Sequence, residues 1–199
     1  IGVTGSDGKT TTTTIIAGLL KAAGRTVHVG GNIGTPLLSQ AGEMSPEDIA
    51  VLELSSFQLM TMGQSPHIAV VTNLAPNHLD VHKSMEEYVD AKRNIFAHQR
   101  PGDRVILNYD NAITRSFADT APGQAAFFSR TQALPEGYCV RENAVWNAEA
   151  HRRILDLDDI LLPGVHNIEN YMAAIAAVEG LVPDEVIRGF AKTFAGVEH

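Results

Sequence analysis

The chain has 199 residues, 44% of them hydrophobic, and a formal net charge of −8 at pH 7. Nucleic acids and anionic membranes call for a basic protein face, so this charge argues against both kinds of partner. The single cysteine, Cys139, excludes an internal disulfide and a cysteine-based zinc site, and it is typical of the reducing cytoplasm. No apolar run approaches the roughly 20 residues of a membrane span, and no signal peptide is visible. We therefore expect a cytoplasmic globular protein.

The first ten residues, Ile1-Gly2-Val3-Thr4-Gly5-Ser6-Asp7-Gly8-Lys9-Thr10, have the pattern of a phosphate-binding loop. Glycines allow successive backbone N–H groups to turn toward phosphate oxygens, and the following helix adds a partial positive charge. We expect Lys9 to reach the terminal phosphates of a nucleotide and the Thr10 hydroxyl to ligate Mg²⁺. The strict phosphate-loop pattern fails at Val3, where it requires glycine, but the variant Thr-Gly-Ser-Asp-Gly-Lys-Thr fits. The alternative is a glycine-rich turn that binds nothing.

Hydrophobic periodicity then alternates between strands and helices, which predicts an α/β fold with a mostly parallel sheet flanked by helices. A helix should follow the loop over Thr10–Ala23, with Gly24 as its stop. The next predicted elements are, in order, strands at Val27–Val29, Ile49–Leu54 and Ile68–Thr72, a helix from Ser84 to about Phe96, a strand at Val105–Leu107, a helix near Ala112–Ala118 and a strand at Ala125–Phe128. The segment Ser84-Met85-Glu86-Glu87 has the pattern of a capping box at the start of its helix.

The last third of the chain departs from this parallel alternation. Gly137–Asn147 predicts a hairpin that turns near Glu142-Asn143, with Arg152–Leu155 pairing alongside, which gives a small antiparallel β patch. An alanine-rich helix over Ile168–Gly180 and a helix after Pro183 complete the prediction. Because the chain lacks an initiator methionine and starts directly on a predicted strand, we expect residues 1–199 to be one domain of a longer protein.

Polar residues follow the apolar run Ile49–Leu52. Glu53 ends an apolar run, and in phosphate-loop proteins an acid at the carboxyl end of a neighbouring strand holds Mg²⁺. The alternative for Glu53 is an acid at a solvent-exposed strand end. Ser55 and Ser56 come next, and their hydroxyls suit contact with phosphate or substrate.

The segment from Asn73 to His82 leaves another strand at its carboxyl end, where open α/β sheets place ligands. His78 is a candidate metal ligand there, although a lone loop histidine is more often solvated. His78 and His82, with Asp80 between them, superficially resemble a zinc pair, but no helix is predicted across them.

Lys92 falls on the apolar stripe of its predicted helix, and a lysine facing the core is costly unless it is paired, extends to solvent or is modified. Extension to solvent is one interpretation. The other is a desolvated lysine with a lowered pKa that reacts with CO₂, and the resulting carbamate would be an oxygen ligand for Mg²⁺.

Three asparagines lie at positions where they could face a ligand. Asn32 follows a strand in the tight turn Gly30-Gly31-Asn32-Ile33-Gly34, from which it could point into the same crevice. Asn167 stands where it could cap the helix near residue 168, and a capping role is the favoured interpretation. Asn170, one turn later, could instead reach the edge of a nucleotide base.

These motifs, in this order, resemble the Mur ligases, which are ATP-dependent amide-forming enzymes of peptidoglycan synthesis. The resemblance rests on the first loop and on Gly31-Asn32-Ile33-Gly34, Asn77-His78-Leu79-Asp80, Ala91-Lys92 and His166-Asn167-Ile168-Glu169-Asn170. Within the family, Glu53-Leu54-Ser55-Ser56-Phe57-Gln58-Leu59 resembles the branch that joins D-glutamate to UDP-N-acetylmuramoyl-L-alanine. The resemblance covers the family's central ATPase domain, over residues 1–199, without the flanking domains that bind the uridine nucleotide and the amino acid.

The resemblance implies a set of functional residues. It implies ATP binding by Gly5, Ser6, Asp7, Gly8, Lys9, Thr10, Thr11, Asn167 and Asn170, the two asparagines facing adenine. It implies a first Mg²⁺ on Thr10 and Glu53, and a second on Glu53, His78 and carbamylated Lys92. It implies substrate contacts from Asn32, Ser55 and His78, and catalytic roles for Lys9, Lys92 and His78. The implied substrates are ATP, UDP-N-acetylmuramoyl-L-alanine and D-glutamate, and we expect a monomer.

Other interpretations remain open. Folylpolyglutamate synthases share the fold and the loop, but the Ser55-Ser56-Phe57-Gln58-Leu59 run argues against them. The isolated domain could also be a nucleotide-binding module without turnover, because positioning by the flanking domains supplies much of the catalysis. A simple phosphate-loop kinase would need neither the Asn-His-Leu-Asp loop nor a buried lysine.

Overall fold

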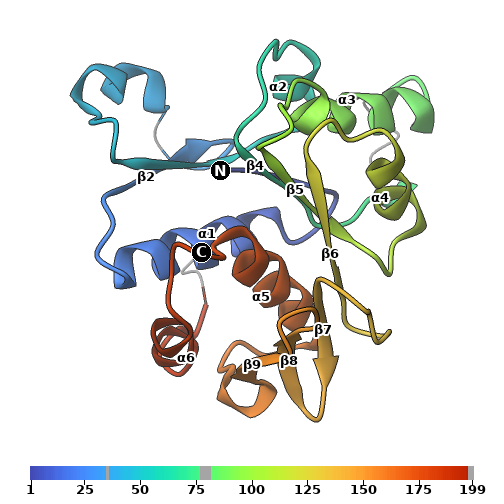
Figure 1. The fold of residues 1–199 in the computed structure, drawn as a ribbon. Coiled ribbons are helices and arrows are strands. Elements are labelled where there is room, and N and C mark those ends of the chain that lie inside the picture. The colour runs from blue at the N-terminus through green and yellow to red at the C-terminus, as the bar shows by residue number, and fades with distance from the viewer. Residues whose placement is uncertain (35, 77–81, 197–199) are drawn as a thin grey trace.

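The computed structural model describes residues 1–34, 36–76 and 82–196, and their strands form one nine-stranded sheet (Figure 1). The strand order is β2-β3-β1-β4-β5-β6-β7-β8-β9. The strands are β1 (Gly2–Thr4), β2 (Val27–Gly31), β3 (Ile49–Glu53), β4 (Ile68–Val71), β5 (Arg104–Asn108), β6 (Gln124–Ser129), β7 (Tyr138–Arg141), β8 (Ala144–Asn147) and β9 (Arg152–Asp156). None of the helices in these described ranges is long and apolar enough to cross a membrane.

The sheet is parallel from β2 to β7 and antiparallel over β7, β8 and β9. The hairpin between β7 and β8 turns at Glu142 and Asn143, whose φ angles of 47° and 55° are those of a tight hairpin turn. These pairings confirm the predicted α/β fold, with a mostly parallel sheet and a small antiparallel patch.

Helices cover both faces of the parallel region (Figure 1). One face carries α1 (Lys9–Ala22), α5 (Val165–Ala177) and α6 (Asp184–Ala191), and the other carries α2 (Ser56–Met60), α3 (Met85–Ala97) and α4 (Ala112–Ser116). Short 3₁₀ turns lie at η1 (Leu37–Glu43), η3 (Phe117–Asp119) and η4 (Leu157–Asp159). The sheet therefore forms the middle layer of three.

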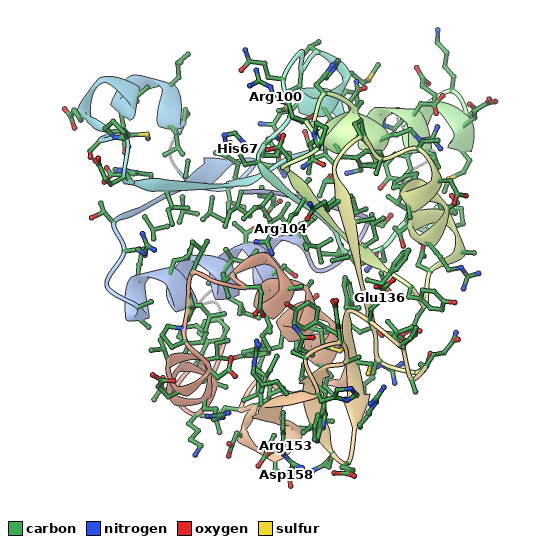
Figure 2. All side chains as sticks on the ribbon, viewed as in Figure 1. His67, Arg100, Arg104, Glu136, Arg153 and Asp158 are labelled. Carbon is green, nitrogen blue, oxygen red and sulfur yellow. The ribbon has the colours of Figure 1, made fainter. Side chains whose placement is uncertain are left out.

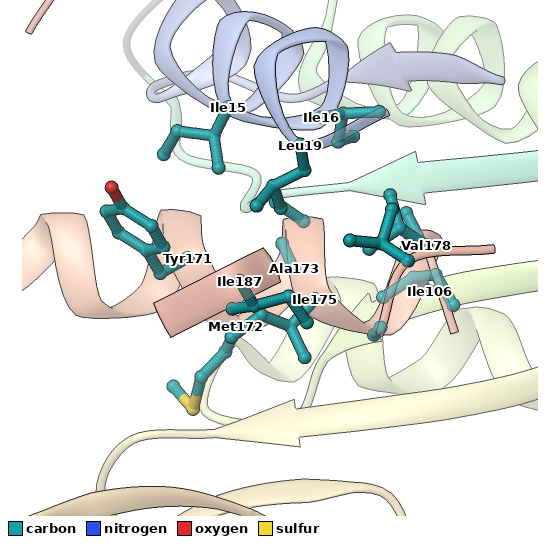
Figure 3. Close-up of a cluster of buried hydrophobic side chains, with 14 of the residues drawn as sticks. Ile15, Ile16, Leu19, Ile106, Tyr171, Met172, Ala173, Ile175, Val178 and Ile187 are labelled. Carbon is teal, nitrogen blue, oxygen red and sulfur yellow. The ribbon is translucent and has the colours of Figure 1, made fainter. Parts of the chain in front are cut away.

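A hydrophobic core lies on each face of the sheet. Ile15, Leu19 and Ile175 are fully or almost fully buried between α1, α5 and the strands, as Figure 3 shows. On the other face, Ile95 and Phe96 of α3 pack in a separate buried cluster. Because α1 starts directly after the first loop, its burial in the larger core fixes the position of that loop.

Arg104, at the start of β5, stabilises the end of α5. Its guanidinium donates hydrogen bonds to the carbonyl oxygens of Ala176 and Ala177 at 3.5 and 3.3 Å, and Figure 2 shows its position in the molecule. A cation at the carboxyl end of a helix is favourable, because the last carbonyl groups there lack helical partners.

Three local features differ from the sequence-based expectations. The helix α2 and the turn η1 were not predicted, although Ser55 and Gln58 form a complete capping box at the start of α2. The capping box predicted at Ser84 is only half present. Ser84 accepts a hydrogen bond from the Glu87 amide, but the Glu87 carboxylate bonds the Lys83 amide instead of that of Ser84.

Candidate active site

The first loop lies between β1 and α1, at the edge of the sheet where the parallel strands β1, β3 and β4 end. Gly5 and Gly8 have φ angles of 149° and 78°, which side chains rarely tolerate. A Cβ atom on Gly5 would come within 1.9 Å of Thr72 Oγ1, and one on Gly8 within 2.4 Å of Asn170 Oδ1. Both glycines are therefore required by conformation and by close packing.

Lys9 is folded back over this loop. Its ammonium donates hydrogen bonds to the carbonyl oxygens of Gly5 and Ser6, each at 3.0 Å. The N–H groups in the first turn of a helix have no helical acceptors, so those at the start of α1 are open to an anion. Among the described residues, the loop therefore presents a cation beside helix-start amides that lack helical acceptors, the arrangement that binds phosphate.

Glu53, at the end of β3, faces the first turn of α1 from the neighbouring strand. Its side chain is 2% exposed, so the alternative of a solvent-exposed strand end is wrong. One carboxylate oxygen accepts a hydrogen bond from the Thr10 hydroxyl at 2.7 Å, and the other accepts one from the Asn32 amide at 3.2 Å. The hydroxyl and carboxylate oxygens of Thr10 and Glu53 are the hard ligands that Mg²⁺ prefers, and their closeness fits one ion.

Lys92 of α3 does not extend to solvent, because its side chain is 2% exposed. Its ammonium donates to Thr4 Oγ1 at 2.9 Å and to the carbonyl oxygen of Gly5 at 3.2 Å. Burial lowers the pKa of Lys92 to about 7, with repulsion from Lys9 adding to the effect and attraction to Glu53 opposing it. The interpretation that Lys92 extends to solvent is therefore wrong, and the carbamate on this lysine stays a prediction.

These elements enclose a pocket of about 170 Å³. It is lined by Gly5, Lys9, Asn32, Ser55, Ser56, Phe57, His82, Tyr88 and Lys92. Four residues predicted at different points of the chain, Lys9, Asn32, Ser55 and Lys92, thus share one cavity. The Ser55 hydroxyl also caps α2 by accepting the Gln58 amide at 3.3 Å.

One wall of the pocket was missed by the sequence reasoning. His82 stacks on Phe57 with ring centroids 5.3 Å apart, and its Nε2 is 2.8 Å from the Ser56 hydroxyl. The Tyr88 and His82 rings pack edge to face with centroids 5.2 Å apart, and the Tyr88 hydroxyl lies 3.0 Å from the Ser6 hydroxyl of the loop. The one available signal was that Tyr88 precedes Lys92 by one helical turn, which puts both on the same face.

His78, with the rest of residues 77–81, lies outside the described residues, so its predicted metal role stays a prediction. Within the described ranges, no group of three or more His, Cys, Asp or Glu side chains is placed to hold a metal ion.

The two asparagines of α5 lie behind the loop. The prediction that Asn167 caps the helix is wrong, because Gly164 takes the N-cap position of α5 with a φ of 99°. Asn167 instead donates to the Pro163 carbonyl oxygen at 2.6 Å and accepts the Asn170 amide at 2.9 Å. Asn170 accepts the Thr12 hydroxyl at 3.2 Å. This network fixes α5 against the first two turns of α1, next to Gly8.

The sheet, the loop and the carboxylate at the end of β3 define a phosphate-loop α/β domain. Residues 3–178 match the family described as the Mur ligase middle domain. The chain belongs to this family, which confirms the resemblance seen in its sequence.

Individual relatives agree with this assignment. The chain is 55% identical over 199 residues to a UDP-N-acetylmuramoylalanine--D-glutamate ligase of Acetivibrio thermocellus. It is 51% identical over 199 residues to the protein of the same name from Ruminiclostridium cellulolyticum. Each alignment covers 99% of this chain and 43% of the relative, so the chain spans less than half the length of these proteins.

Solved structures share the fold at lower sequence identity. The structure of a UDP-N-acetylmuramoyl-L-alanyl-D-glutamate--2,6-diaminopimelate ligase superposes with a TM-score of 0.81 and 23% identity, over 100% of this chain and 46% of that chain. MurF from Acinetobacter baumannii superposes with a TM-score of 0.69 and 22% identity, over 99% of this chain and 46% of that chain. At 22% and 23% identity, these similarities show that the fold is shared.

Proposed function

We propose that this chain is the ATP-binding domain of a ligase that joins D-glutamate to UDP-N-acetylmuramoyl-L-alanine. The observation that carries the proposal is the convergence of Lys9, the Thr10–Glu53 pair and buried Lys92 around the phosphate loop. The names of the two relatives described above support the choice of substrates. We infer a cytoplasmic reaction, because the proposed substrates include ATP and a nucleotide-linked precursor.

In this reaction the alanine carboxylate attacks the γ-phosphorus of ATP, which releases ADP and forms an acyl phosphate. The amine of D-glutamate then attacks the acyl carbon, the tetrahedral intermediate expels phosphate, and the amine proton is lost as the amide forms. Activation is needed because an unactivated carboxylate oxygen is too poor a leaving group to be displaced by an amine. Lys9 stabilises the negative charge on the transferred phosphoryl group.

Thr10 and Glu53 would hold one Mg²⁺, and Glu53, His78 and a carbamate on Lys92 would hold a second. Mg²⁺ supplies charge neutralisation and orientation for phosphoryl transfer. A lysine with a pKa of about 7 has a large fraction of neutral amine at neutral pH, and the neutral amine is the form that adds CO₂. Asn32 and Ser55 line the pocket beside these groups and would contact the muramoyl-alanine.

Gly5 to Thr11 would bind the phosphates of ATP, and we assign Asn167 and Asn170 to the adenine side of the loop. Their carboxamides already bond each other, Thr12 and Pro163. Within the described residues each Nδ2 donates one hydrogen bond, so each carboxamide has a second N–H that could meet a base edge. The flanking domains of the longer protein would supply the uridine-nucleotide and D-glutamate sites, and without them we expect binding of Mg·ATP but no turnover.

Phosphate release by the full-length protein that contains this chain tests the proposal. We expect release that requires ATP, UDP-N-acetylmuramoyl-L-alanine and D-glutamate together, and none when L-glutamate replaces D-glutamate. The matched control replaces the muramoyl substrate with a reduced folate, the acceptor of the alternative ligase class. Turnover with the folate but not with the muramoyl substrate would contradict the proposal, as would equal rates with both.

A further inference from the structure

Asn73 stands directly after β4 and contacts the phosphate loop through both its side chain and its backbone. Its Oδ1 accepts the Asp7 amide N–H at 3.0 Å, and its Nδ2 donates to the Asp7 carbonyl oxygen at 3.2 Å. Its own carbonyl oxygen accepts the Ser6 N–H at 2.8 Å. The carboxamide thus pairs with both backbone groups of Asp7, as a neighbouring strand would.

Thr72 adds to the same contact. Its hydroxyl lies 2.6 Å from the Asp7 carbonyl oxygen and 3.3 Å from that of Thr4, and it is packed so closely that Gly5 has no room for a Cβ atom. The Asp7 carbonyl oxygen therefore accepts from both Thr72 and Asn73. The Asp7 N–H, in contrast, donates to the Asn73 side chain.

These contacts decide which amides of the loop face an anion. The N–H groups of Ser6 and Asp7 both donate hydrogen bonds to Asn73, which fixes the direction of the loop backbone there. The amides that follow, from Gly8 into the first turn of α1, are the ones left open. A loop that already has this conformation before the nucleotide arrives loses less entropy on binding.

We propose that Asn73 is a positioning residue of the phosphate loop, which holds Asp7 so that the loop is preformed for the phosphates of a nucleotide. This inference rests on the proposed nucleotide binding. Asn73 need not touch the ligand, because it acts through the Asp7 backbone.

A purely structural role for Asn73 is the competing explanation, and the chain offers a matched control for it. Asn111 bonds the residue that follows Asn73, since its Nδ2 donates to the Leu74 carbonyl oxygen at 3.0 Å. Its Oδ1 also caps α4 by accepting the Thr114 amide at 3.0 Å. Asn111→Ala thus removes one hydrogen bond to the residue after Asn73 and one that caps α4, and neither involves the phosphate loop.

The experiment is a calorimetric titration of the chain and its variants with a non-hydrolysable ATP analogue and Mg²⁺, alongside thermal unfolding. We expect Asn73→Ala to weaken binding by about three- to tenfold, the effect of one or two lost neutral hydrogen bonds. Asn111→Ala should lower the melting temperature at least as much and leave the affinity within about twofold of wild type. Asn73→Ser, which stays polar but is too short for both contacts, replaces Asn73→Ala if the latter does not fold.

Amide exchange in the nucleotide-free chain provides a second measurement. We expect the Asp7 N–H to exchange faster in Asn73→Ala than in wild type, and at the wild-type rate in Asn111→Ala. Equal affinities of wild type and a folded Asn73 variant would overturn the role of Asn73 and leave the proposed function intact. No binding of Mg·ATP by the wild-type chain would contradict both.

Discussion

In the antiparallel patch, Arg152 of β9 faces two carboxylates, Glu179 and Asp184, each at 2.9 Å. At the phosphate loop, Lys9 and Lys92 instead bond carbonyl and hydroxyl oxygens. Among the described residues, neither lysine has an acidic group within ion-pair distance, whereas the patch also contains the Arg153–Asp156 pair at 2.8 Å. Figure 2 shows Arg153 at the far end of the molecule from α2 and α3.

The charged groups of the patch and of the loop therefore have different roles. Arg152 is paired within the fold, whereas Lys9 and Lys92 are available to a ligand. An arginine between two acids is already compensated, and a further anion would gain little from it. A buried ammonium on neutral acceptors keeps most of its charge uncompensated, which is unfavourable for folding and favourable for binding an anion. The loop end of the sheet is therefore the end that we expect to bind phosphates.

The substitution expected to have the largest effect is Lys9→Ala. It removes the ammonium from the loop, so we expect the affinity for Mg·ATP to fall by about 100-fold, the upper range for a hydrogen bond to a charged group. Calorimetric titration measures the change, with Lys21→Ala in the last turn of the same helix as the control. An unchanged affinity in Lys9→Ala would mean that the loop does not bind the phosphates.

The second prediction concerns the pH dependence of stability. Because the pKa of Lys92 falls from 10.5 to about 7 on folding, the unfolded chain holds more protons than the folded chain between these values. The contribution of Lys92 to the free energy of unfolding therefore rises with pH between about 7 and 10.5, by at most about 1.4 kcal/mol per pH unit. Lys92→Met lacks the titrating group, so its free energy of unfolding should not show this rise.

Urea unfolding of both proteins between about pH 7 and 9, in CO₂-free buffer to prevent carbamate formation, measures the difference. Burial raises the pKa of Tyr138 and Tyr171, but both proteins contain these groups, so the comparison cancels their effect. A difference between wild type and variant that does not change with pH would show that the ammonium at Lys92 is already compensated, as in the patch.

The smallest effect is expected from Arg152→Met in the patch. Its ion pairs with Glu179 and Asp184 are partly exposed, so their loss should cost only about 0.5 to 1 kcal/mol of unfolding free energy. The affinity for Mg·ATP should stay at the wild-type value. A loss of affinity in this variant would contradict the claim that the charges of the patch stabilise the fold and do not contribute to nucleotide binding.

Local patterns were enough to predict much of the site. The Gly-Lys-Thr loop is contiguous in sequence, and Glu53 ends an apolar strand, so the parallel topology brings both to one edge of the sheet. Lys92 was recognised because it interrupts a helical apolar stripe, but sequence alone left two interpretations for it. Only the packing of α3 against β1 and the loop decided between them.

The rest of the site depends on contacts between distant segments. Asn73 meets Asp7, and His82 meets Ser56, across separations of 66 and 26 residues that no periodicity encodes. The helix start at Asn167 was misplaced because Gly164, with its positive φ, takes the capping position. The helix α2 was missed although Ser55 and Gln58 have capping-box spacing, because its five residues give too short a periodic signal.

The most direct test of the central claim is a calorimetric titration of this 199-residue chain with a non-hydrolysable ATP analogue, with and without Mg²⁺. The predicted result is one-site binding that Mg²⁺ strengthens, because Thr10 and Glu53 supply ligands for the ion beside the loop. The absence of binding up to millimolar analogue, or an affinity that is the same without Mg²⁺, would contradict the account.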